Sequence, residues 1–494
     1  MYTFGHPPSG DWILVDGRHI QRVGTGEPPA SDRQVDLPGT TIIPGFIDGH
    51  VHLTSTGSAL ANEDVARVRT KGELLSLAAG RAEAADDVVA LQGFDESGWD
   101  APELPTLAEL DAAVERPLVI RRIDGHVALA NSAAIAAADV ASTDGCERAD
   151  DGTLTGVLTR QANARLGRWT ASSRSDHDIE RLQLAAASLA AARGVTSVHE
   201  MSMPHDDGER DVEVFRRHRD QLPVHAIAIV ATMDVPRAIE LGHDAIGGDL
   251  PTDGSIGART AAVSEPFVAT DGTGVTYYAD DELAGFFHDA HMAGLQVGVH
   301  AIGDRAIEQV LTAWERIYAS LDSRERRHFR ARRHRIEHFE MPGVAQIERA
   351  AMLGLAVSVQ PAFDLAWGGP DGLYERRVGA ERAFAMNPIR SMLDRGIVVG
   401  AGSDSPVTAL DPWLAVEAME HHHDPTQRLD RLEAIRIHSV GSARLAHQEE
   451  KKGLLEPGSH ADFAAYDVDP LTAEEVRGLR PVLTVSLGRE VFAA

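Results

Sequence analysis

Short apolar runs alternate, along the middle of the chain, with longer segments in which apolar residues recur at helical spacing. The apolar runs predict buried strands at 42–48, 88–93, 118–123, 195–199, 224–230, 246–252, 296–300, 334–338, 355–360 and 397–403. Segments between them, such as 179–192, 279–293 and 305–319, predict helices. This alternation is typical of βα units and a parallel sheet. Ten strands exceed the eight that close a barrel, so we expect two to belong to insertions.

The two ends of the chain show a different pattern. Strand-like runs at 12–17, 33–37, 461–467 and 482–488 are short and are broken by Gly and Pro. The simplest organisation joins residues 1–41 and 453–494 into one composite β-sandwich domain. An α/β barrel then occupies residues 42–452, and the region 94–175, rich in Ala and Asp, is the best candidate for an insertion in it.

Composition and charge limit the kinds of partner that the protein can bind. The formal net charge of −28 argues against nucleic acid and anionic membranes. No run of 18 or more apolar residues predicts a membrane span, and the N-terminus lacks the pattern of a signal peptide. The single cysteine, Cys146, excludes an internal disulfide and favours a cytoplasmic location.

Two histidines close the first central strand. The segment Pro44-Gly-Phe-Ile-Asp-Gly-His-Val-His52 places His50 and His52 one residue apart. Residues i and i+2 of a strand point to the same side, so both imidazoles can aim at one point beyond the strand end. Neutral imidazole is the commonest metal ligand. A bare His-x-His is weak evidence, but the apolar lead-in, Asp48 and the neighbouring glycines favour a metal site over two ordinary turn histidines.

Three further polar residues lie where other central strands end. His300 and His338 each close an apolar run, and Asp404 follows another. The carboxyl ends of parallel strands meet at one face of a barrel, where catalytic groups gather. Either histidine alone could be an ordinary core histidine, but together with the His-x-His pair these residues predict one site.

A site of several histidines and one carboxylate suits a divalent transition metal. Zn is the first choice, and Mn, Fe and Co are alternatives. An open coordination position would hold a water and lower its pKa toward ~7. Asp404 is placed to take the water proton and pass it to a leaving group. This chemistry is hydrolysis at a carbonyl or amidine-like carbon.

Together these segments resemble the amidohydrolase superfamily, and within it the YtcJ-like branch that includes N-substituted formamide deformylases. The matching segments run nearly from end to end: 44–52, Asp124-Gly-His126 with Asn131-Ser132, 194–199, 253–261, 300–304, 335–338, Gln360-Pro361, 402–406 and 453–462. The resemblance implies a distorted (β/α)8 TIM-type barrel with a composite β domain from both termini.

The resemblance also implies roles for single residues. It implies metal ligands at His50, His52, His300 and His338, and a metal-bound catalytic aspartate at Asp404. The segments that contain Asp124, His126 and Asp253 would line the substrate pocket. The habit of the family further suggests a homodimer.

One departure from the family pattern affects the metal count. Many relatives carry a lysine four residues before the Asp-Gly-Ser segment, carboxylated to bridge two metals, and here that position is Asp249. The three lysines of the chain, Lys71, Lys451 and Lys452, lie in other regions, so a carbamate bridge is excluded. Either Asp249 or another carboxylate such as Glu200 bridges two metals, or the site holds one. With one metal, His50, His52, His300 and Asp404 would be the ligands, and His338 would stabilise oxyanion charge.

Other polar residues have weaker signals. Arg259 could clamp a substrate carboxylate, stack on an aromatic group or form a structural ion pair. Gln360 ends a buried strand and is expected to face the pocket. Glu337 alternates with His338 along a strand, so we expect it to point away and either to be structural or to support a metal ligand. Adjacent histidines on a helix point in different directions, so His421-His-His423 predicts a solvated cluster.

The sequence therefore predicts a metal-dependent hydrolase that acts on a small molecule at a C–N bond other than a peptide bond. The substrate class is an amide, an N-formyl compound or a cyclic amide. One alternative is an aminohydrolase that deaminates a heterocycle with a single metal. A second alternative, from a different class, is a non-catalytic barrel that binds a small molecule, although the complete ligand set argues against it.

Overall fold

The structure is a computed structural model that describes residues 1–61, 65–83, 88–202 and 208–494. Its residues group into two compact units. Unit 1 comprises Met1–Val51, Ala186–Met201 and Arg217–Ala494, and unit 2 comprises His52–Ala185 and the described part of Ser202–Arg216. Eight of the ten predicted strands lie in unit 1, and those at 88–93 and 118–123 lie in unit 2.

Parallel strands form the centre of unit 1. They are β4 (Phe46–Val51), β10 (Val195–Met201), β11 (His225–Ile229), β12 (Ala245–Ile246), β13 (Gln296–Ala301), β14 (Arg335–His338), β15 (Ala356–Val359) and β16 (Val398–Ala401). They pair in two sheets, in the orders β11-β10-β4 and β12-β13-β14-β15-β16. Isolated parallel bridges, from Val230 to Ile246 and from Val51 to Ser405, connect the sheet edges. This strand order is that of a TIM-type α/β fold, although the described strands form two sheets rather than one closed sheet.

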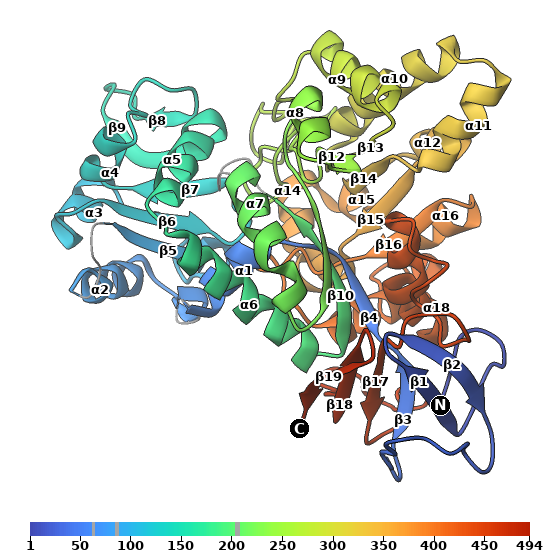
Figure 1. Ribbon diagram of the computed structural model, residues 1–494. Coiled ribbons are helices and arrows are strands. Elements are labelled where there is room, and N and C mark those ends of the chain that lie inside the picture. The colour runs from blue at the N-terminus through green and yellow to red at the C-terminus, as the bar shows by residue number, and fades with distance from the viewer. Residues whose placement is uncertain (62–64, 84–87, 203–207) are drawn as a thin grey trace. The chain divides into compact units, whose positions relative to one another are not determined.

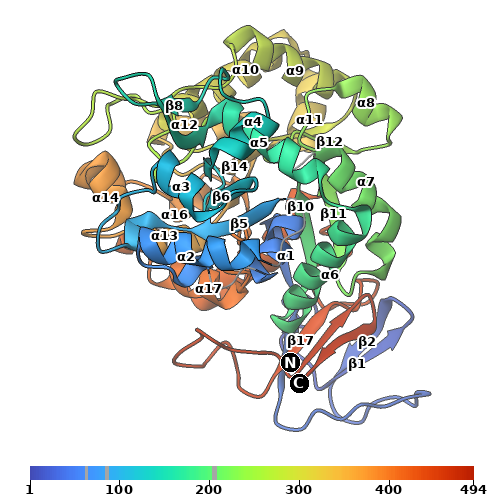
Figure 2. The same cartoon turned by 90° about the vertical axis from the view of Figure 1, so that its left-hand side faces the viewer.

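Helices follow the strands of unit 1 along the chain. Their bounds are α8 (Val235–Glu240), α9 (Asp280–Met292), α10 (Asp304–Ser320), α11 (Ser323–Arg332), α12 (Val344–Leu353), α13 (Pro361–Trp367), α14 (Leu373–Val378), α15 (Ala380–Phe384), α16 (Ile389–Asp394), α17 (Pro412–Glu420), α18 (Arg431–Arg436) and α19 (Ser442–Leu445). Helix α10 buries Ile307, Val310, Leu311 and Trp314, which recur at helical spacing. In both ribbon views α9 and α10 lie on one side of β12 and β14 (Figures 1 and 2).

Both ends of the chain contribute to one antiparallel sheet of unit 1. Its order is β19-β18-β17-β3, with β3 at Thr41–Pro44, β17 at Phe463–Tyr466, β18 at Leu483–Ser486 and β19 at Arg489–Ala493. Strands β1 (Trp12–Asp16) and β2 (His19–Gly24) form a separate pair. The N- and C-termini lie near this sheet in both views. The structure thus joins the two ends, and the predicted sandwich domain stays a prediction.

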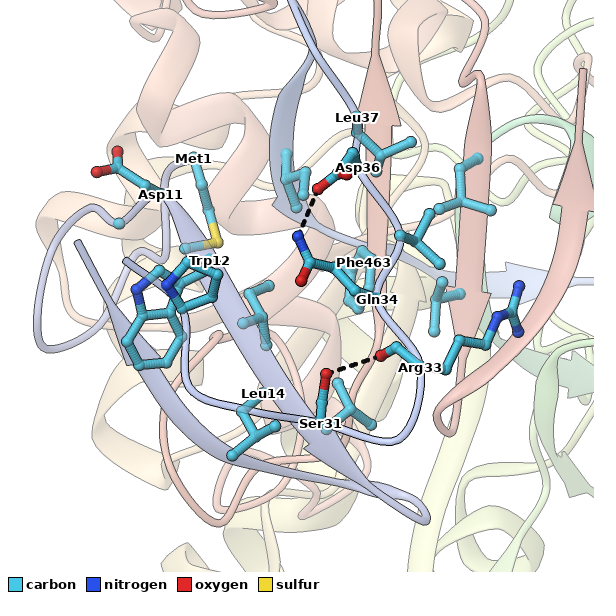
Figure 3. Close-up of a pocket in the computed structure, with 18 of the residues that line it drawn as sticks. Met1, Asp11, Trp12, Leu14, Ser31, Arg33, Gln34, Asp36, Leu37 and Phe463 are labelled. Carbon is cyan, nitrogen blue, oxygen red and sulfur yellow. Dashed lines mark hydrogen bonds between the residues drawn. The ribbon is translucent and has the colours of Figure 1, made fainter. Parts of the chain in front are cut away.

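A cavity of about 590 Å³ lies among these terminal strands (Figure 3). Its lining includes Trp12 and Leu14 of β1, Phe463 of β17 and part of the segment 26–40. Within that segment, Gln34 donates a hydrogen bond to Asp36. The lining contains none of the predicted site residues, so this cavity is separate from the chemistry predicted at the strand ends.

A buried ion pair fixes Asp462, which directly precedes β17 of the terminal sheet. Lys452 Nζ lies 2.5 Å from Asp462 Oδ2, and both side chains are at most 5% exposed. The carboxylate of Asp462 also accepts the N–H of Leu487 at 2.6 Å, and its backbone carbonyl accepts the N–H of Gly45 at 3.0 Å. Asp462, through its carboxylate and its backbone carbonyl, therefore holds together segments from both ends of the chain.

We expect Lys452→Met to lower the free energy of unfolding by roughly 3 to 5 kcal/mol, because it leaves the buried carboxylate of Asp462 without its cation. Urea unfolding of the two proteins measures this loss. The matched control is Lys451→Met, at the exposed neighbouring position, which should change the free energy by less than about 0.5 kcal/mol. Equal losses in both variants would show that the pair has no special part in stability.

Unit 2 contains a mixed sheet in the order β5-β6-β7-β9-β8. Its strands are β5 (Val89–Phe94), β6 (Leu118–Arg122), β7 (Val127–Ala130), β8 (Cys146–Arg148) and β9 (Leu154–Thr159). Alternate residues of β6 pack into two separate hydrophobic cores. Leu118 and Ile120 belong to one core, and Val119 belongs to the other. Helices α1 (Leu53–Ala61), α2 (Lys71–Ala82), α3 (Leu107–Ala113), α4 (Ser132–Ala137) and α5 (Arg160–Ser172) lie in this unit. The predicted insertion at 94–175 falls within it, and its boundaries stay a prediction.

The chain also contains two helices that cross the unit boundaries, α6 (Asp176–Ala192) and α7 (Gly208–His218). Among the described residues, no helix combines the length and the apolar character that crossing a membrane requires.

Candidate metal centre

Three of the predicted histidine ligands surround one carboxylate, that of Asp249. Asp249 Oδ1 lies 3.1 Å from His338 Nε2, 3.5 Å from His300 Nδ1 and 3.8 Å from His50 Nε2. Asp404 Oδ1 lies 3.4 Å from His50 Nε2. None of these side chains is more than 8% exposed. The structure therefore brings together five residues that the sequence proposed for one site.

The ends of the parallel strands place these residues. His50 is the fifth residue of β4, and His338 is the last residue of β14. Asp404 follows β16, and its N–H donates to the carbonyl of His50 at 2.8 Å. His338 and Asp404 have φ angles of 69° and 53°. Such left-handed conformations are unfavourable for residues other than glycine and cluster at functional sites.

Asp249 reaches the histidines because β12 is shorter than the predicted strand 246–252. The strand ends at Ile246, and Gly247 and Gly248 follow with φ angles of 88° and 58°. These left-handed conformations take the chain out of the strand. At Gly247 a Cβ would lie 2.2 Å from the carbonyl oxygen of Gly298, so only glycine fits this turn. The predicted strand 246–252 ran through this turn, although Gly247, Gly248 and Asp249 interrupt the apolar residues between Ile246 and Leu250.

A buried network of hydrogen bonds and an ion pair holds the ring nitrogen of His50 that faces away from Asp249. His50 Nδ1 lies 2.9 Å from Glu337 Oε2, and Arg335 binds both oxygens of Glu337 at 2.8 and 2.9 Å. Arg335 also donates to the carbonyl of Gly49 at 2.9 Å. The sequence predicted that Glu337 would be structural or would support a metal ligand, and it did not indicate Arg335. The available signal was their spacing, since opposite charges two residues apart lie on one face of a strand.

Hydrogen bonds also fix which nitrogen of each histidine faces Asp249. Glu337 accepts the Nδ1–H of His50, and the Gln360 side-chain oxygen accepts the Nδ1–H of His338 at 2.7 Å. The Gly254 carbonyl lies 3.3 Å from His300 Nε2. In a neutral imidazole the other nitrogen then presents a lone pair. Three lone pairs and a carboxylate repel one another unless positive charge lies among them. This donor set fits a divalent cation such as Zn²⁺.

The pKa values of the site residues also indicate that a positive charge is favoured there. Burial by itself lowers the pKa of His50, but the carboxylates of Asp249 and Asp404 outweigh it and raise that pKa well above its usual value. Burial likewise tends to lower the pKa of His300, but interactions with Asp249 and Asp253 outweigh it and raise that pKa to about 10. Burial tends to raise the pKa of Asp249, but the histidines hold it well below its usual value. The site therefore favours positive charge beside its carboxylates.

Four other predicted site residues lie in unit 2 or in β10, and their roles stay predictions. His52 follows Val51 of β4 directly, is buried, and is the first residue of unit 2. Asp124 and His126 lie in unit 2 between β6 and β7. The Asp124 carboxylate accepts a hydrogen bond from Arg122 at 2.8 Å and one from the N–H of His126 at 3.1 Å, so it holds its own turn. Glu200 is buried in β10, whereas the carboxylate among the three histidines is that of Asp249.

Three predicted substrate-binding residues lie in unit 1, and two of them, Asp253 and Gln360, contact these histidines. The Asp253 carboxylate accepts the backbone N–H groups of Ala262, Ile302 and Gly303 at 2.8, 3.1 and 2.9 Å, so it anchors its loop. Arg259 is exposed. Gln360 is buried and orients His338. Contact of any of these residues with substrate stays a prediction.

The predicted solvated histidine cluster is wrong for two of its three members. Helix α17 ends at Glu420, so His421, His422 and His423 are not on a helix. His422 is only 2% exposed, and its ring stacks on that of His423 with centroids 4.4 Å apart. Both rings face Asp364.

We expect Glu337→Gln to weaken metal binding roughly 10- to 100-fold, because residues that orient a ligand histidine affect metal affinity by that amount. Competition with a chelator of known affinity measures the change. The matched control is Glu315→Gln, which also loses a carboxylate paired with an arginine, Arg349, but at the partly exposed surface of α10. Unchanged affinity in Glu337→Gln would show that His50 does not need this bond.

The chain is similar to known proteins over nearly its whole length. The Amidohydrolase family model matches residues 33–492. Protein YtcJ of Bacillus subtilis (strain 168) is 27% identical over 480 residues, which cover 89% of this chain and 86% of that protein. N-substituted formamide deformylase of Arthrobacter pascens is 25% identical over 517 residues, which cover 96% of this chain and 93% of that protein.

A solved structure extends the comparison to three dimensions. The crystal structure of an uncharacterized metal-dependent hydrolase from Pyrococcus horikoshii OT3 is similar with a TM-score of 0.74 and 25% identity, over 94% of this chain and 95% of that chain. The family model and this likeness span nearly the whole sequence, and they confirm the predicted family resemblance. This chain belongs to the Amidohydrolase family.

Proposed function

We propose that this protein is a metal-dependent hydrolase that cleaves a C–N bond other than a peptide bond in a small amide, N-formyl compound or cyclic amide. The observation that carries the proposal is the convergence of His50, His300 and His338 on Asp249, with Asp404 beside them. Likeness to N-substituted formamide deformylase over 96% of the chain supports the substrate class.

The residues of this site would hold the metal. His50, His300, His338 and Asp404 would be ligands, the His-x-His spacing adds His52, and Asp249 would bridge when two ions bind. Zn is the first choice, with Mn, Fe or Co as alternatives. When bound, such a metal polarises a carbonyl oxygen and makes a water more acidic.

The residues of the chain would handle the proton. Asp404 would accept the proton of the attacking water and donate it to the leaving nitrogen, as a general base and then a general acid. Glu337 and Gln360 would keep His50 and His338 in the required orientation. Burial of the carboxylates would keep their charges away from bulk water, where their effect would be weaker.

A substrate panel tests the proposal. We expect purified protein supplied with Zn²⁺ to hydrolyse one or more N-substituted formamides, simple amides or cyclic amides, with release of amine or carboxylate. Ammonia release from purines, pyrimidines or pterins, without amide hydrolysis, would instead establish the deaminase. Binding of panel compounds without turnover of any would contradict both and favour the binding scaffold.

The cellular setting is also a proposal. The single cysteine supports a cytoplasmic enzyme, and the net charge of −28 supports a small-molecule substrate rather than a nucleic acid or an anionic membrane. The family resemblance adds a homodimer. Light scattering on the purified protein tests the oligomeric state.

A further inference from the structure

A second group of imidazoles and a carboxylate lies in unit 1, on residues that the proposed reaction does not use. Asp364 belongs to α13, and His422 and His423 follow α17. His422 Nε2 lies 3.7 Å from Asp364 Oδ1, and His423 Nδ1 contacts the same oxygen. The backbone N–H of His423 donates to Asp364 Oδ2 at 3.2 Å. Both imidazoles therefore aim at one carboxylate.

Hydrogen bonding shows that this group needs positive charge at its centre. His423 Nε2 lies 3.0 Å from the backbone carbonyl oxygen of Phe384, which can only accept, so this nitrogen carries a proton. In a neutral ring, Nδ1 of His423 then directs a lone pair at the Asp364 carboxylate. Two acceptors in contact repel each other unless a proton or a metal ion lies between them.

His422 supplies an independent observation. Its side chain is 2% exposed, and its Nε2 has no hydrogen-bond partner among the residues that the structure describes. A buried polar atom without a partner is rare in folded proteins and calls for an explanation. Here the atom faces the Asp364 carboxylate, which His423 also contacts. One nitrogen from each histidine and one carboxylate oxygen lie within 4.8 Å of one another.

We propose that Asp364, His422 and His423 bind a divalent transition-metal ion, with Zn²⁺ the first choice. Two imidazoles and a carboxylate are ligands that Zn²⁺ takes, and three protein ligands leave a fourth position for water. Binding moves the His422 proton from Nε2 to Nδ1, which breaks the hydrogen bond from the Asp424 N–H at 3.1 Å. The loss is one local hydrogen bond, and the gain includes relief of the contact between His423 and Asp364.

Metal counting on matched variants tests this site. The protein is stripped with a chelator, dialysed against buffered Zn²⁺ and assayed by elemental mass spectrometry. We expect the double variant His422→Gln/His423→Gln to hold one equivalent less than the wild type. The matched control, His421→Gln, removes the exposed histidine next to the cluster and should match the wild type. Equal zinc content in all three proteins would overturn the proposal.

Diffraction on the wild type keeps the test independent of variant folding. In a crystal soaked with ZnCl₂, we expect an anomalous peak at the zinc edge among Asp364, His422 and His423. A peak at His50, His300 and His338 without a second peak at Asp364 would mean that a proton on His423 neutralises the cluster, and the proposal would fail. Failure here leaves the proposed hydrolase intact, because the two sites share no residue.

Discussion

Replacing Asp404 by asparagine should lower the kcat of hydrolysis roughly 10²- to 10⁴-fold, the range typical of a lost general acid–base group. The asparagine side chain has nearly the same size as that of aspartate, but its amide can no longer take the proton of the attacking water. We expect the protein to keep its fold, because the Asp404 backbone N–H still donates to the carbonyl of His50. Steady-state kinetics on a substrate found in the panel measures the loss.

Metal content in the same preparation separates the two ways in which this variant could lose activity. If Asp404 acts on the proton, adding Zn²⁺ restores the metal content but not kcat. If it serves only as a ligand, excess Zn²⁺ restores both, and the proton-transfer role is wrong. The control Asp281→Asn removes an exposed carboxylate of α9 and should leave kcat unchanged.

The positions of His50, His300, His338 and Asp404 could be predicted because strand ends are visible in a sequence. A strand of a parallel sheet is buried on both faces and appears as a short apolar run, so a histidine at its end is easily recognised. The ends of such strands share one face, so residues as distant along the chain as His50 and Asp404 can be grouped from the sequence alone.

Long-range partners could not be predicted in this way. Glu337 binds His50 across 287 residues, and nothing local to either residue indicates that pairing. The sequence also could not identify which two strands leave the central sheets, since 88–93 and 118–123 have the same apolar character as the others. His422 and His423 were misjudged because the end of α17 at Glu420 was not recognised.

The count of metal ions depends on Asp249, and its replacement should have the second large effect. If Asp249 bridges two metals, the wild type should hold two equivalents at the metal centre, and Asp249→Asn should hold one or none. The physical reason is that an amide is a far weaker metal ligand than a carboxylate, so the second ion loses its shared anion. Elemental mass spectrometry in the His422→Gln/His423→Gln background confines the count to this site.

The matched control is Asp244→Asn, an exposed aspartate just before β12, which should keep the full metal content. A wild-type count of one, unchanged in Asp249→Asn, would exclude the bridge. The carboxylate of Asp249 would then be a hydrogen-bond partner of His338 at 3.1 Å, and His338 would be available to stabilise oxyanion charge. That outcome would also strengthen the deaminase alternative, because the predicted deaminase uses a single metal. A count of two that falls in Asp249→Asn would instead identify this aspartate as the replacement for the missing lysine.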